Sequence, residues 1–100
     1  MTALDPSRLQ TLLHQMIGDM GAAAVAPLVV LGDRLGLYKA LAAGGQMTSE
    51  ELADRTATTE RYVREWCLAQ AGFGYISYDA TSGQFSMSPE QQAVFADADS

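Results

Sequence analysis

Cysteine and histidine are almost missing from this sequence of 100 residues, which has one of each, Cys67 and His14. A single cysteine excludes an internal disulfide framework and is typical of a reducing compartment, so we expect a cytoplasmic protein. A single histidine excludes a histidine-based metal cluster. We expect His14 to lie on the surface or at an interface. Cys67 is expected to be a buried structural thiol, because no histidine lies near it in the sequence to activate it.

Positive charge is also scarce. Six Lys and Arg face twelve Asp and Glu, which gives a formal net charge of -6 and a pI near 4.4. Non-specific affinity for nucleic acid comes from clustered cations that neutralise phosphates. The charge balance therefore argues against nucleic acid as a partner.

The sequence lacks a long apolar run and a phosphate-binding glycine motif. The longest apolar run, residues 22–31, is interrupted by Pro27 and is shorter than the ~18–20 residues of a membrane-spanning helix. Gly72 and Gly74 follow a predicted helix rather than a strand and have no third glycine, which is the wrong context for a dinucleotide loop. We therefore expect no membrane partner, and we predict no catalytic, cofactor-binding or metal-ligating residue in this chain.

The residues that are present suffice for one folded domain. Hydrophobic residues make up 48% of the chain and charged residues 18%. A chain of this composition can bury a core and is not a disordered tail. The length leaves no room for a second globular unit, so residues 1–100 are predicted to form a single domain.

Two helices are predicted near the N-terminus. The first covers residues 5–20, begins with an Asp-Pro cap and ends before Gly21. The second covers residues 23–35, where Pro27 either starts the firm part of the helix or kinks it. Large apolar side chains recur at steps of three and four along both helices, which places them on one face of each. They are Leu9, Leu12, Leu13, Met16, Ile17 and Met20 in the first helix, and Leu28, Leu31 and Leu35 in the second.

The rest of the chain has the element order of a winged helix. We predict helices over 37–43, from 49 onward, over 59–71 and from 89 onward, with strands over 75–79 and 84–87. Thr48 and Glu51 have the spacing of a capping box, as do Ser88 and Gln91. The predicted fold class is mainly α, a winged helix-turn-helix with one β-hairpin wing and extra N-terminal dimerisation helices.

A winged helix suggests DNA binding, so the charges on the expected contact surface are decisive. Within residues 48–70, three arginines face five acidic residues, and Arg61 and Arg64 are each next to a glutamate. The wing carries Asp79 and no cation. Winged helix proteins that bind DNA contact phosphates through Arg or Lys on the recognition helix and usually on the wing. The pattern favours a winged helix that contacts protein, with a DNA-binding regulator as the alternative.

The N-terminal helices carry more apolar surface than a winged helix of roughly sixty residues needs for its own core. They could cover the winged helix within one chain, or they could pack against another chain. Symmetric pairing is the commonest way to bury such helices, so we favour a homodimer. The predicted interface consists of Leu9, Leu12, Leu13, Met16, Ile17, Met20, Leu28 and Leu31.

Several stretches of the sequence resemble a known family. They are LGDRLGLYKAL at residues 31–41, TSEELA at 48–53, ERYVREW at 60–66, GYI at 74–76 and FSMSPE at 85–90. Together they are similar to the N-terminal winged-helix dimerisation domain of bacterial class I S-adenosylmethionine-dependent methyltransferases. Cys67 departs from the family pattern, which usually has a larger aliphatic residue at that position.

The resemblance implies a role inside a larger enzyme. In that family the region dimerises the enzyme and forms part of the wall or lid over a small-molecule substrate pocket. S-adenosylmethionine binds to a following Rossmann-like domain whose glycine-rich loop has no counterpart here, so no catalytic or cofactor residue is carried over. On this basis we expect dimerisation helices in 1–45, the helix-turn-helix and wing in 46–88, and the start of a connection to an absent catalytic domain in 89–100.

We therefore expect a dimerisation and substrate-lid domain of an S-adenosylmethionine-dependent small-molecule methyltransferase, which is not catalytic by itself. The expected partners are a second copy, the chain's own C-terminal Rossmann-like domain, and a small-molecule substrate in the full-length protein. The alternatives are a winged-helix DNA-binding transcriptional regulator and a pure interaction module.

Overall fold

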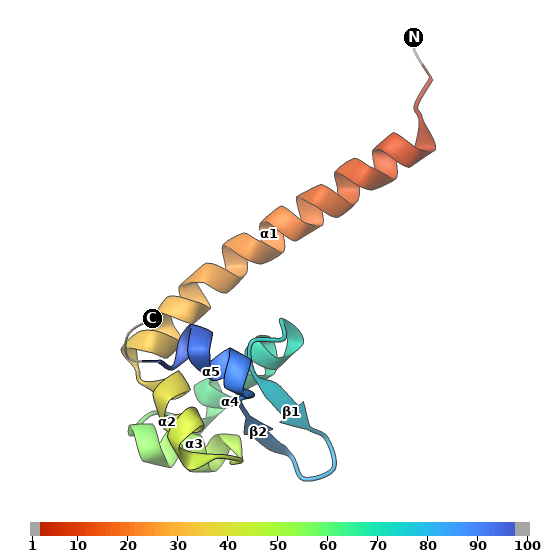
Figure 1. The fold of residues 1–100 in the computed structure, drawn as a ribbon. Helices are drawn as coiled ribbons and strands as arrows, with labels where there is room; N and C mark the ends of the chain where they lie inside the picture. The colour runs from red at the N-terminus through yellow and green to blue at the C-terminus, as the bar shows by residue number, and fades with distance from the viewer. Residues whose placement is uncertain (1–2, 98–100) are drawn as a thin grey trace.

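One long helix, α1, projects from a body that holds the other elements (Figure 1). The computed structural model describes residues 3–97, so residues 98–100 of the predicted connection lie outside the described residues. The elements in chain order are α1 (Pro6–Arg34), α2 (Leu37–Gly44), α3 (Ser49–Thr56), α4 (Glu60–Gly72), β1 (Ser77–Asp79), β2 (Gln84–Ser86) and α5 (Pro89–Phe95). This order confirms the predicted winged helix.

The N-terminal part of the chain is one continuous helix, so the predicted break at Gly21 between two helices is wrong. Residues 22–26 are four alanines and a valine. Alanine has the highest helix propensity, and a single glycine costs only about 1 kcal/mol relative to alanine. The helix therefore continues through Gly21, and Pro27 lies inside it rather than at its start.

The helix-turn-helix is formed by α3 and α4. The predicted capping box opens α3, since Thr48 Oγ1 accepts from the N–H of Glu51 at 3.2 Å and Glu51 Oε1 accepts from the N–H of Thr48 at 3.1 Å. The hydrogen bonds from Thr48 hold the pKa of Glu51 below its ordinary value. Upstream, Gly36 has a φ of 73°, and this left-handed conformation allows the sharp turn from α1 into α2.

The wing begins later than predicted, at Ser77 instead of residue 75. The reason is that α4 ends in a Schellman motif, in which the N–H of Tyr75 donates to the carbonyl of Gln70 at 3.0 Å and that of Gly74 donates to Ala71 at 3.1 Å. The backbone of Tyr75 therefore completes the helix end and is not free to start the strand. β1 and β2 then pair antiparallel over three residues each.

The second strand also ends early, at Ser86 instead of residue 87. The side chain of Gln92 donates to the carbonyl of Met87 at 2.9 Å, which takes Met87 out of the ladder. The second predicted capping box follows at once. Gln91 Oε1 accepts from the N–H of Ser88 at 2.8 Å and the N–H of Gln91 donates to Ser88 Oγ at 3.1 Å, which starts α5.

The core lies between α2, α3, α4 and the wing, with Tyr38 near its centre. The Tyr38 ring packs edge-on against Trp66 and stacks on Phe95, with ring centroids 5.0 Å apart in both pairs. The predicted burial of Cys67 is confirmed, and desolvation raises the pKa of its thiol to about 12. The buried cluster contains Leu37, Tyr38, Leu41, Met47, Leu52, Ala53, Val63, Trp66, Cys67, Ile76, Phe85 and Met87.

Helix α1 meets the body at Gly32, which is buried. A Cβ atom on Gly32 would lie 2.4 Å from Trp66 Cζ2 and 2.7 Å from Tyr38 Cε2, so only glycine fits without movement of these rings. Trp66 Nε1 also donates to the carbonyl of Leu28 at 2.9 Å. We call this contact of Gly32 with the two rings the Gly32 notch.

One buried polar pair in the core gives a testable prediction. The Tyr38 hydroxyl donates to Oε1 of the fully buried Gln70, and Gln70 Nε2 has no hydrogen-bond partner among residues 3–97. Tyr38→Phe is expected to lower the free energy of unfolding by about 1–2 kcal/mol, because Oε1 then loses its partner as well. Urea unfolding followed by circular dichroism measures this loss.

A double variant serves as the control for this pair. In Tyr38→Phe/Gln70→Met both polar groups are removed together, so the double variant is expected to lose less than the sum of the two single variants. Strictly additive losses would show that the two side chains do not act as a pair.

Candidate interaction surface

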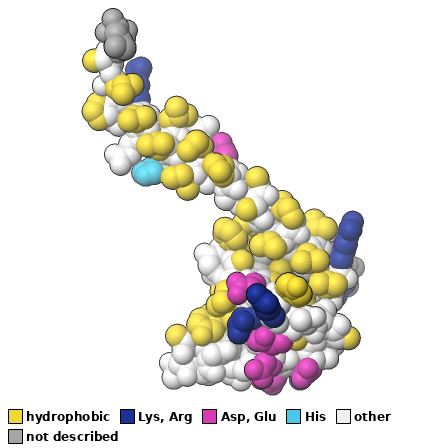
Figure 2. Space-filling view, turned by 180° about the vertical axis from the view of Figure 1, so that it is seen from behind, with side chains coloured by type: hydrophobic (Ala, Val, Ile, Leu, Met, Phe, Trp, Pro, Cys, Tyr) yellow, Lys and Arg dark blue, Asp and Glu magenta, His cyan; other side chains and the backbone are white. Residues whose placement is uncertain are grey.

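The projecting part of α1 carries most of the predicted interface residues. Figure 2 shows hydrophobic side chains gathered along this helix where it stands clear of the body. Leu9, Leu12, Leu13, Met16, Ile17 and Met20 have exposed fractions between 44% and 66%. Leu31 is 45% exposed, whereas Leu28 is partly buried against the core cluster. The structure therefore places seven of the eight predicted interface residues on exposed surface and Leu28 on the side that packs on the body.

Five of these exposed side chains, together with the exposed Pro27, form one line along the helix. With 3.6 residues per turn, positions spaced by three, four or seven residues lie above one another. We call this line the apolar stripe; it consists of Leu9, Leu13, Met16, Met20, Pro27 and Leu31. Because Leu31 remains exposed beside the body, the stripe continues along the full length of α1.

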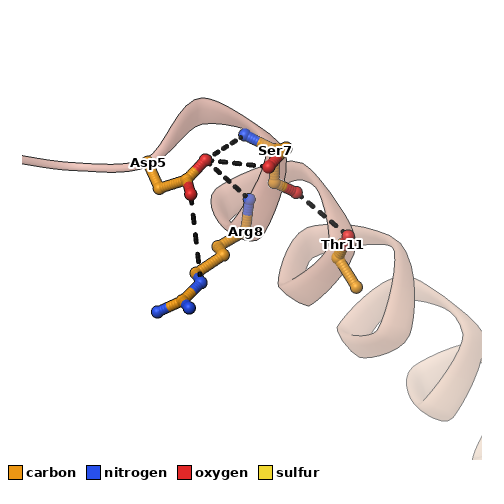
Figure 3. Close-up of polar contacts among 4 residues, drawn as sticks. All are labelled: Asp5, Ser7, Arg8 and Thr11. Carbon is orange, nitrogen blue, oxygen red and sulfur yellow. Dashed lines mark hydrogen bonds and ion pairs between the residues drawn. The ribbon is translucent and has the colours of Figure 1, made fainter.

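The first turn of α1 is held by Asp5 (Figure 3). Its Oδ1 accepts from the hydroxyl of Ser7 at 2.8 Å and from its N–H at 2.9 Å, and its Oδ2 lies 3.9 Å from Arg8 Nε. The hydrogen bonds from Ser7, with a weaker one from the N–H of Arg8, lower the pKa of Asp5. The Arg8 side chain is 90% exposed, so its guanidinium is accessible to a partner.

The opposite end of α1 also carries an acid and a base. Asp33 and Arg34 are both exposed, and they line an open groove of about 430 Å³ between α1 and α5. The groove has apolar walls from both helices, which include Val29, Val30, Val94 and Phe95. The sequence did not single out these end charges, because their significance depends on which side of the helix the body occupies.

By length and composition, α1 is long and apolar enough to cross a membrane. This finding differs from the expectation drawn from the short apolar run at residues 22–31, because α1 is apolar on average over a longer stretch despite its scattered polar residues. One such helix is weak evidence, since core helices and signal sequences have the same properties.

The helix-turn-helix surface has the mixed charge that the sequence predicts. Arg61 and Arg64 are exposed on α4 beside the exposed Glu65, while Glu60 Oε1 accepts from the hydroxyl of Ser49 at 3.1 Å and thus links α4 to α3. His14 is exposed on α1, as predicted. Within residues 3–97, no group of three or more His, Cys, Asp or Glu side chains could hold a metal ion.

The helix-turn-helix followed by a two-stranded wing defines a winged helix domain. The chain belongs to the family of Rv2258c-like winged helix-turn-helix domains, whose model matches residues 23–96. That match includes the body and the docked part of α1, while most of the projecting part lies outside it. No curated protein matches the chain.

Among the solved structures that share the fold are those of two larger proteins. One is a protein of Nostoc punctiforme PCC 73102 that is provisionally named an O-methyltransferase, with a TM-score of 0.67 and 17% sequence identity over 89% of this chain. The other is PigF, solved with SAH, with a TM-score of 0.67 and 19% identity over 88% of this chain. The chain spans about a quarter of each of them, 24% in both cases. The predicted resemblance is thus confirmed for the family and the fold.

Proposed function

We propose that this chain is the dimerisation and substrate-lid domain of an S-adenosylmethionine-dependent small-molecule methyltransferase. The observation that carries the dimerisation role is the apolar stripe, which lies exposed on a helix that the body holds at the Gly32 notch. Monomeric soluble proteins rarely expose a contiguous apolar surface of this kind. The fold shared with PigF and with the Nostoc protein supports the link to methyl transfer.

The winged helix is not catalytic by itself in this proposal. S-adenosylmethionine would be held by a C-terminal Rossmann-like domain, and the small-molecule substrate would lie between that domain and this one. SAH is what S-adenosylmethionine becomes when it gives up its methyl group, so its presence in PigF supports this cofactor for the larger protein. We place the protein in the cytoplasm.

The 100-residue chain allows a direct test. Sedimentation velocity at tens of micromolar is expected to show a dimer, and calorimetry with S-adenosylmethionine is expected to show no binding. A monomer would contradict the dimerisation role. Tight cofactor binding would contradict the proposal that the C-terminal domain, and not this one, holds S-adenosylmethionine. A gel shift at low salt is expected to show no DNA binding; retarded DNA with a steep salt dependence would favour the transcriptional regulator instead.

A further inference from the structure

We propose that two copies pair through α1 in an antiparallel register centred on Met20. In this register Met20 meets the partner's Met20, and Leu9 of each copy lies opposite the partner's Leu31. The inference rests on the proposed dimerisation role and adds the orientation and register of the two helices. Three features of α1 support it: the size pattern of the stripe, the charges at the two ends, and the groove beside α5.

Side-chain size changes along the stripe. The half before Met20 has large residues, whereas residues 22–26 are four alanines and a valine. In the antiparallel register Met16 lies opposite the partner's Ala24, so a large side chain near the centre of the pair faces a small one, as close packing requires. A parallel pair would place Met16 against the partner's Met16 and alanine against alanine, with crowding in one half and a gap in the other.

The charged residues at the two ends are complementary in the same register. With 3.6 residues per turn, Asp5, Arg8, Asp33 and Arg34 fall on one flank of the stripe. Antiparallel helices bring like flanks together, so Arg8 faces the partner's Asp33 and Asp5 faces the partner's Arg34. A parallel pair would bring opposite flanks together, so these acid–base contacts would be lost. Exposed ion pairs add little affinity, but they select the register.

One charge near the centre opposes the pairing. Asp19 lies on the same flank and approaches the partner's Asp19 in this register. The side chain is exposed at the edge of the stripe, where solvent and salt screen the repulsion. The attractive contacts at the two ends therefore outnumber the repulsive one.

The groove between α1 and α5 has a place in this arrangement. It lies on the flank of Asp33 and Arg34, where the partner's first helical turn arrives in the antiparallel register. Leu4 precedes that turn and is 79% exposed. The partner's Leu4 would fill the apolar part of the groove, beside Val30 and Val94. A second copy thus covers both the stripe and the groove.

Disulfide trapping in the full chain distinguishes the registers. Under mild oxidation, Met20→Cys is expected to form a covalent dimer, and a mixture of Leu9→Cys with Leu31→Cys is expected to form a mixed disulfide. Leu9→Cys alone is expected to stay uncrosslinked, because 22 residues of helix separate positions 9 and 31 by about 33 Å. The parent chain is the control, since its Cys67 is buried.

Charge exchange gives a second measurement that needs no crosslinking. Arg8→Asp is expected to raise the dimer dissociation constant about three- to tenfold, because it places two acids together at each end. The exchange variant Arg8→Asp/Asp33→Arg is expected to return the constant to near the parent value. An exchange variant that is weaker than Arg8→Asp would overturn the register.

The outcomes separate this inference from the proposed function. A dimer in which Leu9→Cys crosslinks to itself would be parallel and would overturn the register alone, and so would a dimer without the mixed disulfide. A monomer would overturn both proposals. Flotation of a monomeric chain with phosphatidylcholine vesicles would identify a lipid surface, rather than a second copy, as the occupant of the stripe.

Discussion

Met20→Glu is expected to convert the dimer into a monomer at tens of micromolar, with a rise of at least about a hundredfold in the dissociation constant. The change places a carboxylate of each copy in the middle of the stripe, where it must leave water beside an identical charge. Burying an unpaired charge costs several kcal/mol, and about 2.7 kcal/mol already corresponds to a hundredfold weaker complex. Sedimentation velocity over a concentration series measures the effect.

Thr11→Glu is the matched control for this variant. It adds the same side chain to the same exposed helix, but Thr11 lies on the side of α1 opposite the stripe. The control is expected to dimerise as the parent does. If both variants were monomeric, added negative charge rather than the stripe would explain the result; if both stayed dimeric, the stripe would not be the interface.

Gly32→Ala is expected to lower the free energy of unfolding by about 1–2 kcal/mol and to loosen α1 from the body. The new methyl group would overlap the buried Trp66 and Tyr38 rings, so the helix or the rings must shift. Overpacking of this kind costs about 1–3 kcal/mol, while alanine in place of glycine returns up to about 1 kcal/mol of helix propensity. Urea unfolding and the near-ultraviolet signal of Trp66 measure the two effects.

Gly18→Ala, in the same helix, is expected to have the opposite effect and to raise the free energy of unfolding. A Cβ atom on Gly18 would have nothing within 4 Å, so the variant keeps only the gain in helix propensity, up to about 1 kcal/mol. The difference between the two variants isolates the contact at the notch. Equal effects of the two substitutions would show that Gly32 does not need to be a glycine.

Local signals in the sequence predicted the helix starts of the body well. The capping boxes at Thr48 and Ser88 depend only on residues three positions apart, and both are formed. The strand limits were less accurate, because the end of α4 uses the backbone of Tyr75. Competition between neighbouring elements for the same N–H group is not visible in the alternation of polar and apolar residues.

The contacts that place α1 could not be predicted in this way. Gly32 and Trp66 are far apart in the sequence, and their contact requires α1 and α4 to cross at one point. The apolar periodicity of α1 correctly marked the stripe, but it treated Leu28 like the others because periodicity does not show which side the body covers. Gly21 was misread as a helix end because glycine is common there, although the alanines that follow favour helix.

Any change in the angle of α1 at the Gly32 notch is amplified along the length of the helix. Pro6 lies 26 residues before Gly32, which corresponds to about 39 Å along the helix. A tilt of about 10° at the notch would therefore displace the far end of α1 by about 7 Å, more than one helical turn. In a dimer built on the stripe, a contact made inside the core of each body thus sets the distance and angle between the two bodies, even though none of its ring atoms belongs to the interface.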